Sequence, residues 1–160
     1  MKKILVLIIV VGLMLGFSAK FVWAQDYAPK VKEAMKLLKD KLNALGTPSL
    51  QGGFLYFGTI DMNGNFDIVD EIEDAMGCTA TVFMKKGDGF VRISTNVMKE
   101  GHRAIGTKLA EDSPAMASIK IGEAYYGPAD ILGFKYETGY EPIKNAAGEI
   151  IGVYYVGYKL

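Results

Sequence analysis

The sequence contains two arginines, Arg92 and Arg103, and both lie in one patterned stretch of chain. Lysine occurs sixteen times, so arginine is used sparingly. A guanidinium presents five donors in a rigid planar fork, which matches a carboxylate better than an ammonium does. We therefore interpret Arg92 as a candidate anion-binding residue.

Each arginine also has a structural interpretation. Arg92 could pair with an acid on a neighbouring strand and form only a structural ion pair. Arg103 is a second candidate for ligand contact, but bonding to backbone carbonyls of the loop that follows it is the interpretation we favour. The sequence leaves both alternatives open.

Hydroxyl and aromatic side chains near these arginines could complete a pocket. Side chains on a strand alternate between its two faces, so Tyr136, Thr138 and Tyr140 share one face. By the same rule Arg92 and Thr95 point to opposite faces, unless a β-bulge lies between them. Apolar walls with a few hydroxyls and one cation are typical of small-ligand sites. Taken singly, however, Tyr126, Tyr136 and Tyr140 are more often core residues than ligand contacts.

The elements that would position these residues follow from apolar periodicity and turn residues. Apolar residues at spacings of three and four predict an amphipathic helix over 27–45, and a shorter helix over 66–76 that ends at Gly77. Ser113 and Pro114 predict the start of a third helix, which ends at Ile121. Residues 52–60 are expected to form a strand or an extended crossing, and strands are expected at 78–84, 90–95, 123–127, 134–143 and 149–159.

Catalysis and metal binding have little support in the sequence. Cys78 and His102 are the only cysteine and histidine, and no orienting group or nucleophile motif stands near either. A mononuclear metal site needs three or four clustered ligands, which these two residues do not supply. We therefore expect a protein that is not an enzyme and that carries no metal or cofactor.

Residues 1–24 have the features of an export signal. Lys2 and Lys3 precede an apolar run from Ile4 to Phe17, and Ala24 is a suitable cleavage position. An uncleaved membrane anchor is the alternative. Cleavage would leave residues 25–160 as one domain with 15 basic and 18 acidic residues, a net charge of about −3. That balance argues against nucleic acid as a partner.

Four segments together resemble the Cache family of extracytoplasmic sensor domains, in particular the single-Cache modules of chemotaxis receptors and sensor kinases. They are the segments at 80–83, at 90–97 with 103–107, at 140–143 and at 148–153. The resemblance implies an α+β, PAS-like fold, in which a long N-terminal helix packs on an antiparallel sheet of about five strands. It also implies a ligand between the sheet and the loop and short helix that follow the hairpin.

The resemblance further implies that Arg92 occupies a carboxylate-binding position. Sensors of citrate and four-carbon dicarboxylates carry a histidine and a second arginine where this chain has Thr95 and Thr138. A second carboxylate would then be desolvated without a partner, so a monocarboxylate is the expected ligand. Because the sequence ends at Leu160, signalling is expected to need a separate membrane receptor or sensor kinase. The alternative is an interaction module without a ligand, which dimerises through the apolar stripe of its N-terminal helix.

Overall fold

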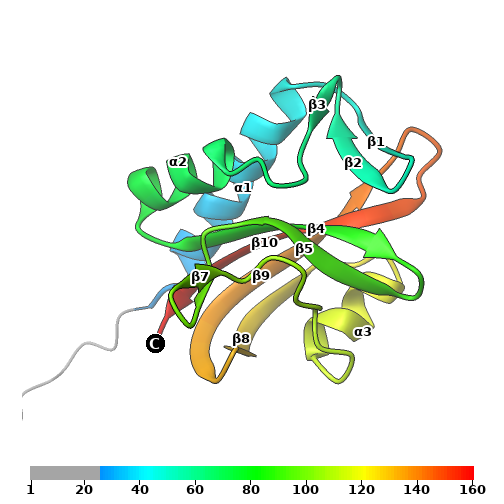
Figure 1. Ribbon diagram of the computed structural model, residues 1–160. Helices are drawn as coiled ribbons and strands as arrows, with labels where there is room; N and C mark the ends of the chain where they lie inside the picture. Colours follow the sequence, from blue (N-terminus) through cyan, green and yellow to red (C-terminus); the bar gives the residue numbers. More distant parts are fainter. Residues whose placement is uncertain (1–25) are drawn as a thin grey trace, which may run out of the picture.

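A five-stranded antiparallel sheet with helices on both faces forms the centre of the protein, whose computed structural model describes residues 26–160 (Figure 1). The export signal expected over 1–24 lies outside the described residues. In the described part, the strand order of the main sheet is β5-β4-β10-β9-β8. Its strands are β4 (Thr79–Lys86), β5 (Gly89–Thr95), β8 (Tyr125–Ile131), β9 (Phe134–Lys144) and β10 (Ile150–Lys159). The helices are α1 (Ala28–Ala44), α2 (Asp67–Met76) and α3 (Pro114–Lys120).

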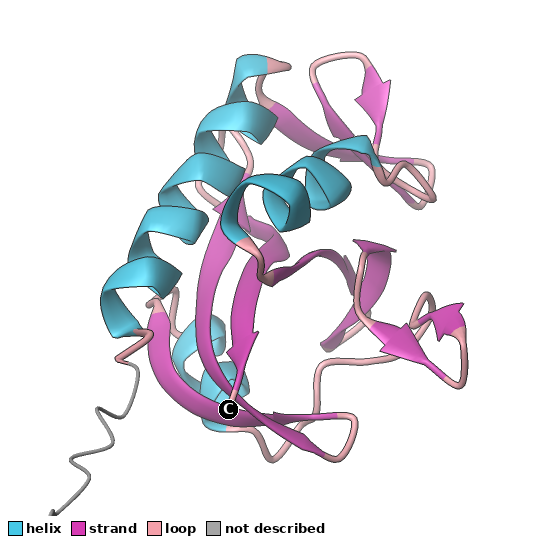
Figure 2. Cartoon of the chain, turned by 90° about the vertical axis from the view of Figure 1, so that its left-hand side faces the viewer, coloured by secondary structure: helices cyan, strands magenta, loops and turns pink. Residues whose placement is uncertain are grey.

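The two faces of this sheet bury separate apolar clusters. Helices α1 and α2 cover one face, where Val82, Tyr154 and Val156 of the sheet are buried (Figures 1 and 2). Helix α3 covers the other face through Ala115, Met116 and Ile119, which meet a cluster that includes Phe83, Tyr140 and Tyr155. This division separates the long-helix side from the side that carries Arg92.

Helix α1 follows the predicted periodicity, with Pro in its first turn. Its apolar stripe is buried against the sheet and comprises Val31, Ala34, Met35, Leu38 and Leu42. The stripe is therefore unavailable as the dimer surface that the sequence suggested, and a dimer would have to use another face of the helix. No helix within residues 26–160 is long and apolar enough to cross a membrane.

The ends of the helices agree with the capping signals in the sequence. Gly77 ends α2 in the left-handed conformation, with φ of 65°. The Ser113 hydroxyl accepts a hydrogen bond from the backbone N–H of Met116, at 3.2 Å, at the start of α3. These caps fix where the chain enters and leaves each helix.

The segment before α2 differs from the single strand or extended crossing expected over 52–60. It forms a small separate sheet of β1 (Pro48–Gln51), β2 (Phe54–Phe57) and β3 (Ile60–Asp61). The glycines at 52, 53 and 58 adopt positive φ and turn the chain between these short strands. A further hairpin of β6 (Met98–Lys99) and β7 (His102–Arg103) was not expected, because its exposed, charged residues carry no apolar alternation.

The two ends of the main fold lie side by side (Figure 1). The ring of Tyr27, just before α1, stacks on that of Tyr158 near the end of β10, with centroids 4.9 Å apart and planes 12° apart. The contact holds the start of the first helix against the last strand.

Cys78 is expected to resist alkylation in the folded protein. Its side chain is buried, and burial raises the pKa of its thiol to about 11. The thiolate is the reactive form, so iodoacetamide at about pH 8 should modify the native protein at least roughly 100-fold more slowly than the urea-unfolded protein. Mass spectrometry of timed samples measures both rates.

The same shift predicts how this thiol affects stability. Because the folded-state pKa lies above the ordinary value of 9.0, the folded state holds this proton more tightly. The stabilisation is complete below about pH 9 and is lost as the pH rises towards about 11. Equal labelling rates in folded and unfolded samples would contradict the burial of Cys78.

Candidate functional site

A β-bulge at Ile93 determines which side chains share the face of the sheet that α3 covers. In the β4–β5 ladder, Val82 pairs with Ser94 and Phe83 pairs with Arg92, so Ile93 is the additional residue. The bulge resets the alternation by one residue. Arg92 and Thr95 consequently lie on the same face, which the sequence allowed only if such a break occurred.

Arg92 is buried without an acidic partner. Its side chain is 3% exposed, and within residues 26–160 no carboxylate forms an ion pair with it. One terminal nitrogen, Nη1, donates to the Thr107 hydroxyl at 2.7 Å, and the guanidinium carbon lies 4.9 Å from the centre of the Phe83 ring. The buried Nε has no hydrogen-bond partner in the described chain. Burial lowers the pKa of Arg92, an effect that Tyr140 and Tyr155 partly oppose.

The loop before α3 is fixed to β5 on both sides of Arg92. The Arg92 backbone N–H donates to the Thr107 carbonyl at 2.9 Å, and its carbonyl accepts from the N–H of Gly106 at 2.9 Å. Leu109 donates to the Phe90 carbonyl at 3.0 Å. The loop therefore covers the edge of the sheet and holds the arginine backbone in place.

Arg92 lines a cavity of about 320 Å³ between this loop and the β8–β9 hairpin. Tyr140 lies in the same wall, with its ring 4.9 Å from that of Tyr155. The Tyr140 hydroxyl has no hydrogen-bond partner within residues 26–160. The remaining lining residues are Lys108, Leu109, Ala110, Asp112, Ser113, Ala129, Asp130, Ile131 and Leu132.

The charges of this cavity are arranged by depth. Arg92 and Tyr140 are buried, whereas Lys108, Asp112 and Asp130 are exposed lining residues. Burial raises the pKa of the Tyr140 hydroxyl, so it stays protonated and able to donate near neutral pH. The interior therefore offers one cation and one hydroxyl to an anion, while a second negative group farther out would meet two carboxylates and one ammonium.

Two of the other expected hydroxyl contacts, Thr95 and Thr138, are already hydrogen-bonded within the protein. Thr95 and Thr138 are fully buried on the Arg92 side of the sheet. The two hydroxyl oxygens of Thr95 and Thr81 are 2.6 Å apart, and the Thr138 hydroxyl donates to the Gly127 carbonyl at 2.6 Å. Tyr136 belongs to the buried apolar cluster under α3, which also contains Tyr140. None of these three residues is part of the lining of the Arg92 cavity.

Arg103 and Tyr126 lie elsewhere. Arg103 makes a bidentate ion pair with Asp70, at 2.7 and 2.8 Å, and donates to the Thr95 carbonyl at 2.8 Å. Arg103 thus joins its hairpin to α2 and to the end of β5, and the one backbone carbonyl that it bonds precedes it in the chain instead of belonging to the loop that follows. Tyr126 sits on the α1 side of the sheet, where its hydroxyl donates to Glu141 at 2.5 Å.

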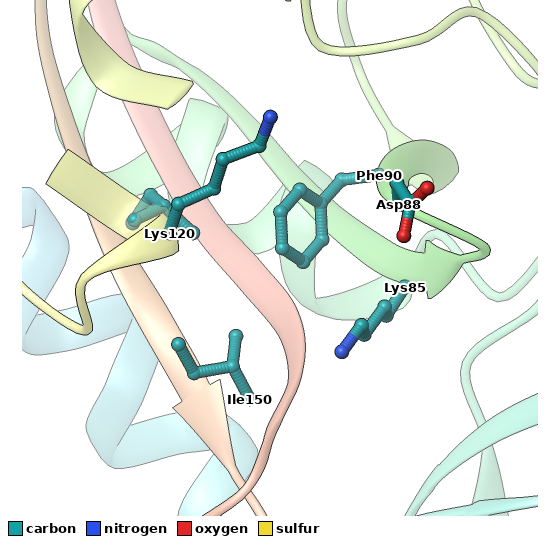
Figure 3. A pocket seen from close by; sticks show the side chains of 6 residues that line it. Lys85, Asp88, Phe90, Lys120 and Ile150 are labelled. Atoms are coloured by element: carbon teal, nitrogen blue, oxygen red, sulfur yellow. The ribbon is translucent and has the colours of Figure 1, made fainter. Parts of the chain in front are cut away.

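A somewhat larger cavity, of about 380 Å³, lies between the β4–β5 hairpin and the end of α3 (Figure 3). The ring of Phe90 lies between Lys85 and Lys120 in this view, and Asp88 and Ile150 are also in the lining. Its charged side chains are all exposed, so water solvates them. Unlike the Arg92 cavity, it contains no buried polar group that lacks a partner.

Several lining residues could not be identified from sequence patterns. Lys108, Leu109, Asp112 and Leu132 lie in loops and a turn, where no periodicity assigns a facing. The available signal was indirect, because the family resemblance placed a ligand beside the loop after the hairpin.

Comparisons with known proteins identify the family. The family model of the Cache 3/Cache 2 fusion domain matches residues 22–160. A search of curated proteins found no match to this sequence. Among solved structures, a candidate transcriptional regulator from Rhodococcus sp. RHA1 is similar, with 12% identity, a TM-score of 0.43, and coverage of 74% of this chain and 71% of that chain. This likeness is too low to support an argument about function.

The observed architecture agrees with the family assignment. A long N-terminal helix packs on a five-stranded antiparallel sheet, which is the expected α+β, PAS-like arrangement. Cache domains are extracytoplasmic sensory modules rather than enzymes, and they generally bind small ligands and sit in membrane receptors. The family match extends over most of the sequence. The chain therefore belongs to the Cache family of sensory domains.

Proposed function

We propose that this Cache domain binds a small monocarboxylate through Arg92 and passes the bound state to a separate membrane partner. The observation that carries this proposal is a guanidinium that is 3% exposed, lacks an acidic partner within the described chain and lines a cavity. A buried cation without a partner is costly, and a bound carboxylate would offset that cost. Tyr140 is the proposed second contact.

Two features favour one carboxylate over two. Arg92 is the only buried cation in the lining, because Lys108 is exposed. Asp112 and Asp130 share that lining and would repel a second negative group. The volume of about 320 Å³ is at the small end of ligand sites, which suits acids such as acetate, propionate, lactate or pyruvate.

A carboxylate panel tests the proposal. Differential scanning fluorimetry and isothermal titration calorimetry would compare acetate, propionate, lactate and pyruvate with succinate and citrate, at fixed ionic strength and with chloride as the control anion. We expect the monocarboxylates to raise the melting temperature in a saturable way, because ligands that bind the folded state stabilise it. Tighter binding of succinate or citrate, or binding of none of these acids, would refute the proposal.

The cellular setting is part of the same proposal. An export signal over 1–24 would deliver the domain to the periplasm, and a membrane receptor or sensor kinase would recognise its occupied form. The competing proposal, an interaction module with no ligand, receives less support because the Arg92 cavity is not filled by protein side chains. Co-purification with a membrane receptor only when a carboxylate is present would favour the sensory role.

A further inference from the structure

Leu132 has an unusual backbone conformation at the tip of the β8–β9 hairpin. Its φ is 54°, and that of the following residue, Gly133, is 90°. These two residues form the whole loop between the paired residues Ile131 and Phe134. Positive φ at both central positions is the mark of a type I′ turn, which strongly prefers Asn, Asp or Gly at the first position. Leucine is disfavoured there because its Cβ crowds the backbone.

The side chain of Leu132 makes contacts that account for its retention at this position. It is half-buried, packs against the cluster under α3 and lines the Arg92 cavity. The turn is also held by Asp130, whose carboxylate accepts from the Gly133 N–H at 2.7 Å. Backbone strain of this kind tends to occur at ligand sites, where the surrounding structure enforces it.

A second turn in the same chain provides an internal comparison. Glu100 and Gly101 form the loop between β6 and β7, with φ of 51° and 81°. Glu100 is exposed and lines none of the cavities described above. The two turns therefore share a backbone conformation, but only the one with Leu132 presents its side chain to the candidate ligand.

The sheet places Leu132 across the cavity from Arg92. Arg92 belongs to β5, one edge of the five-stranded sheet, whereas Leu132 directly follows β8, the opposite edge. Both nevertheless line the same cavity. An acid whose carboxylate meets Arg92 would direct its hydrocarbon end towards the hairpin.

We infer that Leu132 is the residue that limits the length of the bound acid. This inference rests on the proposed function, and it assigns a specificity role to one residue of that site. A smaller side chain at 132 would lengthen the space beyond the carboxylate, and a larger one would shorten it. Asn or Gly would suit the turn better than leucine, but either would leave the cavity open at that end.

Two variants test the inference in opposite directions. Calorimetry would measure the affinities of acetate, propionate, butyrate and hexanoate for the wild type, Leu132→Gly and Leu132→Phe. We expect Leu132→Gly to raise the ratio of hexanoate to propionate affinity by at least about tenfold, the effect of one or more methylenes in an apolar pocket. Leu132→Phe should lower the affinity for butyrate relative to acetate by a similar factor.

Glu100→Gly is the matched control, because it removes a positive-φ side chain from a turn of the same kind that lines neither cavity. Its affinity ratios should equal those of the wild type. If Leu132→Gly unfolds, Leu132→Asn replaces it, since Asn also suits the turn. Wild-type binding of short acids with ratios that shift by less than about twofold in both Leu132 variants would overturn this inference alone. Absence of any carboxylate binding to the wild type would overturn the proposed function as well.

Discussion

Replacing Arg92 with methionine is expected to weaken monocarboxylate binding by roughly 100-fold or more, since loss of one partner of a buried charge pair commonly costs about 3–5 kcal/mol. The guanidinium is the buried cation of the cavity, and a neutral side chain leaves the ligand carboxylate desolvated without a partner. Calorimetric titration of wild type and variant with the tightest acid of the panel measures the change.

The same substitution is expected to stabilise the ligand-free protein. Arg92 is desolvated with an unbonded Nε, and the neighbouring groups that offset that cost include Thr107 and the Phe83 ring but no carboxylate within the described chain. Methionine fills a similar volume without a charge, and such replacements of buried ionic groups are often neutral or stabilising, here by about 1–2 kcal/mol. Urea unfolding without added carboxylate measures the difference.

Arg103→Met is the control for the two opposite effects of Arg92→Met, the loss of carboxylate affinity and the gain in stability. Arg103 is paired with Asp70 and bonded to the Thr95 carbonyl, so its removal should lower the free energy of unfolding by about 1 kcal/mol. Carboxylate affinity should stay close to that of the wild type, because Arg103 is absent from the lining of the cavity. If Arg92→Met lowered stability as Arg103→Met does and left affinity unchanged, Arg92 would be a structural residue.

Gly152→Ala is expected to destabilise the fold by about 3 kcal/mol, the upper part of the usual range for overpacking and strain in a core. A Cβ at Gly152 would lie 2.4 Å from the Phe83 carbonyl oxygen and 3.1 Å from Ile143 Cδ1. Gly152 is in the central strand β10 and pairs with Met84 on one side and Ile143 on the other. Neither neighbouring strand can move without disturbing the whole sheet, so the clash cannot relax cheaply. Urea unfolding provides the measurement.

Gly89→Ala is the matched control for Gly152. Gly89 also lies in a strand of the main sheet, yet a Cβ there would meet nothing within 4 Å. Its φ lies outside the range that favours glycine, so alanine should change the free energy of unfolding by less than about 0.5 kcal/mol. Similar losses in both variants would indicate that backbone propensity, and not the close approach of β4, determines the effect.

Local chemistry made most of the main elements predictable. The three- and four-residue spacing predicted α1, and Gly77 and Ser113 marked helix ends. Apolar alternation with turn residues predicted the strands of the main sheet, except that β8 runs over Tyr125–Ile131 and the expected strand stopped at 127. The small sheet of β1, β2 and β3 was not predictable in the same way. Its strands are two to four residues long, which is too short for a period to emerge.

Only the part of the site that depends on the chemistry of a single residue type could be predicted from the sequence. Arginine chemistry and the family resemblance pointed to Arg92, but the common facing of Arg92 and Thr95 depends on pairing with a neighbouring strand. The bulge at Ile93 arises in the ladder between β4 and β5, and no residue type within β5 predicts its position. The facing of Tyr126 also depends on strand pairing, because its placement on the α1 side follows from the register of β8 with β9.

The contact between Tyr27 and Tyr158 has a practical consequence for biosensor engineering. Because the first helix and the last strand meet there, the domain could be inserted between the two halves of a fluorescent protein through short linkers. The stacked rings thus mark the attachment points for an optical reporter.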